Sequence, residues 1–209
     1  MSKNLSPRQR RLAAALTGTL AALAVSLSLT GAAAAPSAEP TPPATQACWA
    51  EYESGQTACA ADAATLAKTV LEKFNKVSVA SPEEFERIKA AGSYRSLAVP
   101  SGVLASYAIG TLWSDAGYTG SSTTYNTQNS STCYGQTYTF SFPSLALNDQ
   151  ISSFAGSAAC QVRLYDDINY GGGFYGYFDC RSNLAAAGVN FNDRASSVRF
   201  HLTSTYSCF

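Results

Sequence analysis

The strongest constraint on the fold of this chain is a six-residue pattern that occurs twice near its C-terminal end. The first copy is Asn-Asp-Gln-Ile-Ser-Ser at 148–153, and the second is Asn-Asp-Arg-Ala-Ser-Ser at 192–197. Each copy closes a segment that opens with an aromatic residue followed by Tyr-x-Gly, beginning at Trp113 in the first segment and at Tyr165 in the second. Two copies of a whole segment indicate two similar structural units that pack together.

The two segments differ mainly by one insertion. Their openings align without gaps at an offset of 52 residues, whereas the closing hexapeptides align at an offset of 44. The first segment therefore carries eight extra residues, which lie between Asn126 and Leu147 and include Cys133. The matched pairs in the openings are Leu112 with Leu164, Trp113 with Tyr165, Asp115 with Asp167, Tyr118 with Tyr170, Gly120 with Gly172 and Tyr125 with Tyr177.

Apolar and polar residues alternate in several stretches after residue 100. The pattern occurs at 138–142, 161–164 and 198–203. This period of two is typical of strands with one buried and one solvated face. We therefore predict that residues 101–209 form an all-β domain with its own core.

The N-terminal residues 1–34 are predicted to be an export signal. Lys3 and three arginines precede an apolar run at about 12–29, and Ala34 ends a sequence suited to signal cleavage. The run is rich in alanine and threonine, which favours cleavage over a membrane anchor. We expect no membrane association after cleavage.

The charge of the remaining chain limits its partners. Removal of residues 1–34 lowers the number of basic residues from 14 to 10 against 14 acidic residues, so the net charge becomes −4. This balance argues against nucleic acid or an anionic membrane surface as a partner.

Two further segments precede the β domain. Residues 35–47 are rich in proline and alanine and predict a flexible linker. Residues 48–100 predict a small helical segment of unassigned purpose. Apolar residues at helical spacing over 63–74 predict one helix. A second helix is expected to begin after Ser81, with Pro82 in its first turn, and to end at Gly92.

All six cysteines lie in the part of the chain that would be exported. They are Cys48, Cys59, Cys133, Cys160, Cys180 and Cys208. Disulfides are favoured over a zinc site, because the sequence has no Cys-x-x-Cys and only one histidine. We expect Cys48 to pair with Cys59. Among the three pairings open to the other four, we favour Cys160–Cys180 with Cys133–Cys208.

The repeated hexapeptides offer a set of oxygen ligands suited to calcium. Asn-Asp-x-x-Ser-Ser carries amide, carboxylate and hydroxyl oxygens within one turn of chain, and calcium binds such hard oxygen ligands. A single hexapeptide has only one carboxylate, but two adjacent hexapeptides could complete each other's ligand shells. The alternative is that Asp and Ser only cap turns through backbone hydrogen bonds.

The two segments together resemble a known family. Leu-Tyr-Asp-Asp-Ile-Asn-Tyr-Gly-Gly at 164–172, followed by the second hexapeptide, resembles a Greek-key motif of the microbial βγ-crystallins, and the first segment resembles its partner motif. The resemblance covers about residues 105–205. It implies an all-β, βγ-crystallin-like double Greek-key sandwich, preceded here by the small helical segment, with two bound calcium ions.

The resemblance also implies six calcium ligands, three at each of two sites. They are Gln150 (carbonyl), Ser152 (hydroxyl) and Asp193 (carboxylate) at the first site, and Arg194 (carbonyl), Ser196 (hydroxyl) and Asp149 (carboxylate) at the second. Backbone carbonyls at 114–115 and 166–167 would complete the two shells. The insertion and the cysteines depart from the family pattern, and the charge of Arg194 is expected to weaken binding of the neighbouring ion.

Two functions are consistent with these features. The first is a secreted, disulfide-stapled module whose fold is stabilised by calcium. The second is a secreted inhibitor of an extracellular protease, such as a metalloprotease, because secreted actinomycete inhibitors share the crystallin-like fold. The best candidate for a loop that enters a protease cleft is the polar segment 125–135, although it could also be a surface insertion without function.

We do not expect the chain to be an enzyme. His201, the only histidine, is predicted to point outward from a strand. Asp166 and Asp167 form the most obvious carboxylate pair, but adjacent residues of a strand point to opposite faces. They therefore do not converge as a glycosidase mechanism would require.

Overall fold

The computed structural model describes residues 45–141, 147–186 and 188–202. The predicted export signal and most of the predicted linker lie outside these residues, as do Phe142 and Cys208. No helix in the described part of the chain is long and apolar enough to cross a membrane.

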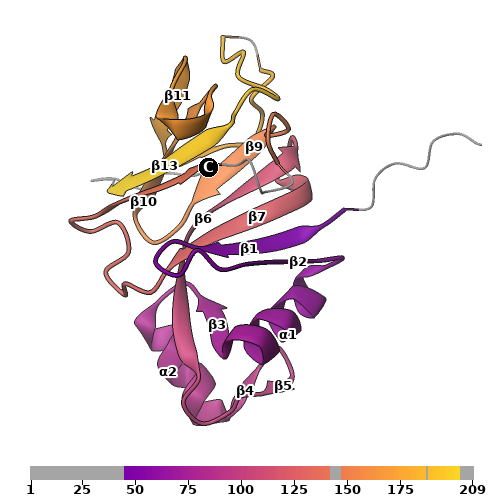
Figure 1. The fold of residues 1–209 in the computed structure, drawn as a ribbon, viewed down its shortest axis with the longest axis vertical. Helices are drawn as coiled ribbons and strands as arrows, with labels where there is room; N and C mark the ends of the chain where they lie inside the picture. The colour runs from indigo at the N-terminus through magenta and orange to yellow at the C-terminus, as the bar shows by residue number, and fades with distance from the viewer. Residues whose placement is uncertain (1–44, 142–146, 187, 203–209) are drawn as a thin grey trace, which may run out of the picture. The chain divides into compact units, whose positions relative to one another are not determined.

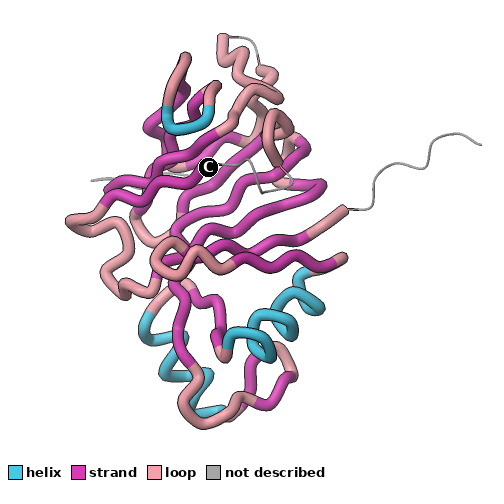
Figure 2. The backbone as a smooth tube through the Cα atoms, in the orientation of Figure 1, coloured by secondary structure: helices cyan, strands magenta, loops and turns pink. Residues whose placement is uncertain are grey.

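The two repeats fold as a double Greek key (Figures 1 and 2). The first repeat supplies β6 (Leu104–Asp115), β7 (Thr119–Thr127), β8 (Thr137–Ser141) and β9 (Ser153–Gly156). The second supplies β10 (Cys160–Tyr165), β11 (Phe174–Phe178), β12 (Cys180–Arg181) and β13 (Ser197–Leu202), with the short helix η1 (Ile168–Tyr170) in its first hairpin. The three alternating stretches predicted as strands correspond to β8, β10 and β13.

Each repeat gives its third strand to the other sheet. One sheet contains the strand order β12-β9-β6-β7, and the other has the order β11-β10-β13-β8. This exchange ties the two repeats together, because neither sheet is complete without a strand from the other repeat. It confirms the predicted all-β, double Greek-key sandwich.

The core lies between the inward faces of the two sheets. Leu112 and Phe154 from one sheet and Leu164, Val198 and Phe200 from the other are fully buried in one apolar cluster. Burial of alternate strand residues explains the period of two in the sequence, since successive side chains of a strand point to opposite faces.

The segment that precedes the double Greek key extends the first sheet, whereas the sequence predicted only a small helical segment there. β1 (Ala47–Glu51) pairs in parallel with β7, and β2 (Thr57–Ala60) pairs with β1. β3 (Lys76–Val79) pairs in parallel with the start of β6. The short strands β4 (Ser93–Tyr94) and β5 (Leu97–Ala98) form a separate hairpin.

The two predicted helices are present with their predicted ends. α1 (Ala63–Phe74) begins after Asp62, whose carboxylate accepts hydrogen bonds from two backbone amides. α2 (Pro82–Ala91) begins after Ser81, whose hydroxyl accepts from Glu84 N, and ends at Gly92 in the left-handed conformation. Both helices contribute to a second apolar cluster that includes Leu71, Val77, Ile88 and Tyr107.

The disulfides confirm one predicted pair and correct the others. Cys48 is bonded to Cys59, as predicted. Cys133 is bonded to Cys160, so the favoured pairs Cys160–Cys180 and Cys133–Cys208 are both wrong. The prediction assumed that Cys160 and Cys180 flank one hairpin. The strand exchange instead places Cys180 in β12, where it pairs with Ala155 of β9, and the sheet of β9 and β12 is not the one that contains Cys160. Cys180 is also disulfide-bonded.

Candidate functional site

The two hexapeptides lie against each other and exchange side-chain contacts. Ser152 Oγ donates to Asp193 Oδ1 at 3.4 Å, and Ser196 Oγ donates to Asp149 Oδ1 at 3.1 Å. Each hydroxyl therefore meets the carboxylate of the other repeat. This is the crossed arrangement that the family resemblance implied for these four residues.

Backbone hydrogen bonds cross between the hexapeptides in the same symmetrical way. Asp149 N donates to Ala195 O, and Asp193 N donates to Ile151 O, each at 3.0 Å. Both aspartates have a φ of 53°, which is unusual for a non-glycine residue. The turns are thus held in a defined conformation that presents one carboxylate on each side of the pair.

The last serine of each hexapeptide fixes the folded hairpin of its own repeat. Ser153 Oγ donates to Asp115 O at 2.6 Å, and Ser197 Oγ donates to Asp167 O at 2.7 Å. These bonds bring the predicted carbonyl segments 114–115 and 166–167 next to the hexapeptides. The hairpin of the second repeat needs glycine at position 172, because the φ of Gly172 is +71° and a Cβ there would lie 2.7 Å from Asp167 Oδ2.

The chemistry of these residues fits calcium better than a transition metal. In the described ranges, no three His, Cys, Asp or Glu side chains group as a metal site. A cation at the hexapeptides would therefore depend on carbonyl and hydroxyl oxygens beside a single carboxylate, which calcium accepts. Gln150 and Arg194, the predicted carbonyl ligands, directly follow Asp149 and Asp193 in the two turns.

The two turns differ in the residue that follows the aspartate. The Arg194 guanidinium forms an ion pair with Asp166 at 2.7 Å and donates to Asn190 O at 2.9 Å. The first repeat has the uncharged Gln150 at this position. The positive charge of Arg194 is thus paired with the Asp166 carboxylate.

A second candidate is the loop 128–136, which joins β7 to β8 and contains most of the predicted protease-binding segment. Its backbone is closed by consecutive turns, in which Thr132 N, Tyr134 N and Gln136 N each donate to the carbonyl three residues before. The Cys133–Cys160 disulfide attaches the loop to the start of β10. The loop is therefore covalently fixed at its centre.

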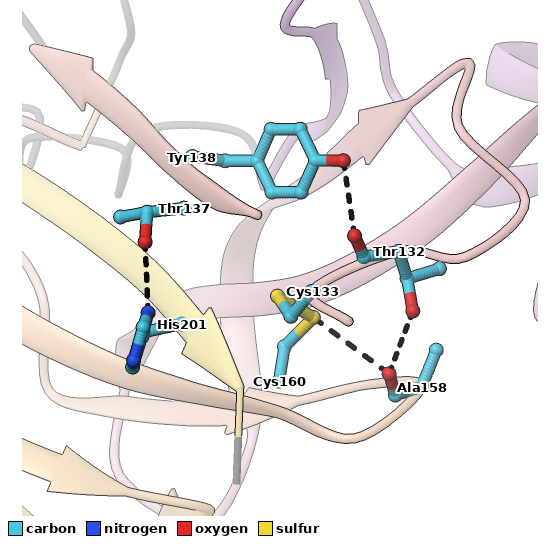
Figure 3. Close-up of a disulfide and its surroundings, with 7 residues drawn as sticks. All are labelled: Thr132, Cys133, Thr137, Tyr138, Ala158, Cys160 and His201. Atoms are coloured by element: carbon cyan, nitrogen blue, oxygen red, sulfur yellow. Dashed lines mark hydrogen bonds between the residues drawn. A yellow bond between two sulfur atoms is a disulfide. The ribbon is translucent and has the colours of Figure 1, made fainter. Parts of the chain in front are cut away.

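Hydrogen bonds reinforce this attachment (Figure 3). Thr132 Oγ1 donates to Ala158 O at 2.8 Å, and Tyr138 Oη donates to Thr132 O at 3.0 Å. Cys133 is fully buried, whereas the side chain that follows it, Tyr134, is 75% exposed. The loop thus holds a large aromatic side chain in solvent directly beside a buried anchor.

The segment after β1 supports the other end of this loop. Glu53 accepts hydrogen bonds from Thr127 Oγ1 and from Gln128 N, the latter at 2.9 Å. Tyr52 packs edge-on against the ring of Tyr138, with ring centroids 5.1 Å apart. The added N-terminal strand therefore braces the candidate loop where it leaves β7.

Glu51 connects the same region to a buried ion pair. It is 1% exposed and pairs with Lys76, while Gln128 Nε2 donates to its carboxylate at 2.9 Å. Burial alone would raise the pKa of Glu51, but hydrogen bonds from Lys76, Ser54 and Gln128 together lower it below its ordinary value.

Comparison with known proteins associates the domain with a family of inhibitors. Residues 112–178 match the model of Peptidase inhibitor family I36. This range includes the whole 128–136 loop and the first hexapeptide. No curated protein shows significant similarity to the sequence.

Solved structures of microbial βγ-crystallin domains are also similar. A domain from Flavobacterium johnsoniae is 28% identical, with a TM-score of 0.35, and the match covers 46% of this chain and 98% of that domain. A domain from Clostridium beijerinckii is 20% identical, with a TM-score of 0.33 and coverages of 46% and 99%. An archaeal βγ-crystallin is 26% identical, with a TM-score of 0.32 and coverages of 44% and 95%.

The strand topology and the family match confirm the predicted resemblance to microbial βγ-crystallins and to crystallin-fold peptidase inhibitors. The strand exchange between the repeats carries the assignment of the fold, and the family match carries the relation to inhibitors. The matched family consists of inhibitors rather than enzymes, in agreement with the sequence analysis.

Proposed function

We propose that this protein is a secreted inhibitor of an extracellular peptidase and that the 128–136 loop enters the peptidase's cleft. The observation that carries the proposal is the match to Peptidase inhibitor family I36 over residues that include this loop. The disulfides support an extracellular location, because they persist in oxidising compartments.

The conformation of the loop supports this role. An inhibitor loses less conformational entropy on binding when its contact loop is already ordered. Here the disulfide, the consecutive turns and the contacts of Glu53 order the loop in the free protein. Tyr134 then supplies an exposed tyrosine side chain, and tyrosine is one of the residue types enriched at the hot spots of interfaces.

The composition around Tyr134 indicates the kind of peptidase. No Asp, Glu, Lys, Arg or His occurs from residue 116 to residue 148. A peptidase whose specificity pocket requires a charged side chain would find no partner in this loop. The proposed target therefore has an uncharged pocket that accepts large apolar or aromatic residues.

An inhibition panel tests this proposal. The mature protein, residues 35–209, would be added to thermolysin, chymotrypsin and trypsin, and residual activity would be measured against inhibitor concentration. We expect saturable inhibition of a peptidase with an apolar pocket and none of trypsin, which requires a basic side chain. Inhibition of trypsin alone, or of none of the three at micromolar concentrations, would contradict the proposal.

We also propose that the paired hexapeptides bind two calcium ions that stabilise the fold. The supporting observation is the crossed approach of each serine hydroxyl to the aspartate of the other repeat. Calcium that binds only the folded state would stabilise it by mass action. Titration calorimetry on chelator-stripped protein should show saturable binding near two ions per chain, and the absence of both heat and a rise in melting temperature would refute calcium binding.

A further inference from the structure

The outer face of the second sheet carries two arginines directly opposite each other. Arg163 of β10 is paired in register with Arg199 of β13. Their strand neighbours Leu164 and Val198 are fully buried in the core, so both arginines lie on the opposite, outward face. Like charges directly opposite on neighbouring strands destabilise a sheet. A feature of this kind needs a compensating interaction.

No carboxylate supplies that compensation in the described part of the chain. The ion pairs there involve Lys68, Lys76, Lys89 and Arg194, and neither Arg163 nor Arg199 takes part in any of them. Both Nε atoms are buried and have no hydrogen-bond partner among the described residues. Each guanidinium group therefore keeps one N–H donor that no described residue accepts.

Aromatic rings hold the two guanidinium groups in place. Arg163 Cζ lies 4.2 Å from the ring centroids of both Phe174 and Tyr177. Arg199 Cζ lies 5.5 Å from the ring centroids of Tyr165 and Tyr170. Stacking against rings fixes the position of a guanidinium group and leaves its hydrogen-bonding edge available. The arrangement is thus preorganised rather than a pair of mobile surface side chains.

We propose that this arginine pair binds a doubly charged tetrahedral oxyanion, namely phosphate or sulfate, free or as an ester. A dianion matches the two positive charges, and guanidinium groups recognise such oxyanions with paired hydrogen bonds. Phe174 is 58% exposed at the edge of the pair and would contact an apolar group attached to the anion. The two arginines belong neither to the 128–136 loop nor to the hexapeptides, although Tyr165 and Tyr170 are hydrogen-bonded through their backbones to Ser196 and Ser197. The inference rests on neither proposed function, because it requires neither peptidase inhibition nor calcium.

The buried Nε–H groups provide a direct readout. Their NMR signals would be followed while sodium sulfate, sodium phosphate, phenyl phosphate or sodium acetate is added at constant ionic strength. We expect saturable shifts of the Arg163 and Arg199 signals with sulfate and phosphate and much weaker binding of acetate. Tighter binding of phenyl phosphate than of phosphate would identify an ester as the ligand, and equal binding would identify the free anion.

Substitutions separate a specific site from a general charge effect. Arg163→Gln and Arg199→Gln should each weaken sulfate binding at least tenfold. In each variant the binding is measured from the shift of the remaining arginine signal. Arg181→Gln is the matched control, because Arg181 also stacks on a ring, with its Cζ 4.2 Å from the centroid of Phe178, but its Nε already donates to Tyr175 Oη. We expect the sulfate affinity of the Arg181→Gln variant to stay within twofold of the affinity of the unmodified protein.

Three results would overturn the inference. They are shifts that do not saturate, equal binding of acetate and sulfate at matched ionic strength, and an equal loss of affinity in the Arg181 control. Backbone amide spectra of each variant would show whether it is folded. Should a variant fail to fold, the titration of the unmodified protein with the four anions still decides the question.

Discussion

At the scale of single residues, a few polar groups decide how the two repeats and the loop are held. Asp149 and Asp193 adopt left-handed backbone conformations that align each carboxylate with a serine of the other repeat. The buried pair of Glu51 and Lys76 lies where the added N-terminal strands meet the first sheet. Single substitutions at these positions therefore separate the roles of the two features.

The crossed contacts predict which calcium site each aspartate serves. Asp149→Ala should abolish the site completed by residues 194–196 and leave the other intact, because the Asp149 carboxylate meets Ser196. Asp193→Ala should abolish the site completed by residues 150–152. Calorimetric titration should give one ion per chain for each variant, and the two variants serve as controls for each other. Two ions in either variant would show that its aspartate is not a ligand.

The Glu51–Lys76 pair predicts how stability depends on pH. Because folding lowers the pKa of Glu51, its contribution is complete above the ordinary value of 4.5 and is lost as the pH falls through the lower, folded-state pKa. Glu51→Gln should cost about 3–5 kcal/mol at pH 7, since it leaves the buried Lys76 charge unpaired. The exposed pair of Glu86 with Lys89 gives the control, because Glu86→Gln should cost less than about 1 kcal/mol.

Urea unfolding from pH 3 to pH 7 measures both quantities. The unmodified protein should lose stability below pH 4.5 more steeply than the Glu51→Gln variant does. Parallel pH profiles for the two proteins would show that Glu51 does not contribute in this range.

At the scale of elements, the 128–136 loop depends on contacts from segments that precede and follow it in the sequence. Its centre is fixed to β10 by a disulfide, and its start is fixed by Glu53, which follows β1. The order of the loop therefore depends on two segments that are distant from it in sequence. The rigidity that the inhibitor proposal requires can be tested at each of these attachments.

Removal of the Glu53 carboxylate should loosen the loop without unfolding the sheets. Glu53→Ala is expected to increase amide hydrogen exchange of Thr132, Tyr134 and Gln136 about tenfold, since a hydrogen bond to a charged group contributes about 1.5–3 kcal/mol. Glu72→Ala on the exposed face of α1 is the control. Unchanged exchange in the Glu53 variant would show that the disulfide alone orders the loop.

The elements also show how far the sequence could predict this structure. The period of two and the capping residues depend on local physics, so the strands β8, β10 and β13 and both helices are found where the pattern places them. The Cys133–Cys160 bond depends on the loop folding back over the link between β9 and β10, and the position of Cys180 depends on strand exchange. No local pattern encodes either relation. The repeat predicted that the two hexapeptides lie together, and the family resemblance implied which serine meets which aspartate. Their role as calcium ligands stays a prediction.

At the scale of the whole molecule, the N-terminal segment and the double Greek key share one sheet. β1 covers the edge of β7 that would otherwise expose unpaired backbone groups, and Ala50 belongs to the core of the sandwich. The segment predicted at 48–100 as small and helical therefore also supplies strands. Nothing in its sequence signalled this, because β1 and β3 are short and the helices dominate its pattern.

This shared sheet predicts that the double Greek key alone is less stable than the longer chain. A fragment of residues 101–209 should retain its β-sheet circular dichroism but melt at least 5 °C lower than residues 35–209, about 1 kcal/mol for a domain of this size. It should also self-associate through the uncovered β7 edge, which sedimentation would detect. Equal melting temperatures would contradict a stabilising role for the added strands.

The central claim is that Tyr134 on its fixed loop enters the cleft of a peptidase. The most direct test is a tight-binding titration of the peptidase inhibited in the panel, using the unmodified protein, Tyr134→Ala and Ile168→Ala. Ile168 is the control because it is an exposed apolar residue, 50% accessible, outside the loop. The account predicts that Tyr134→Ala raises the inhibition constant at least 100-fold, which corresponds to an interface hot spot of about 3 kcal/mol. Ile168→Ala should leave the constant within about threefold of the unmodified protein, a change of less than about 1 kcal/mol. Equal constants for the unmodified protein and Tyr134→Ala would contradict it.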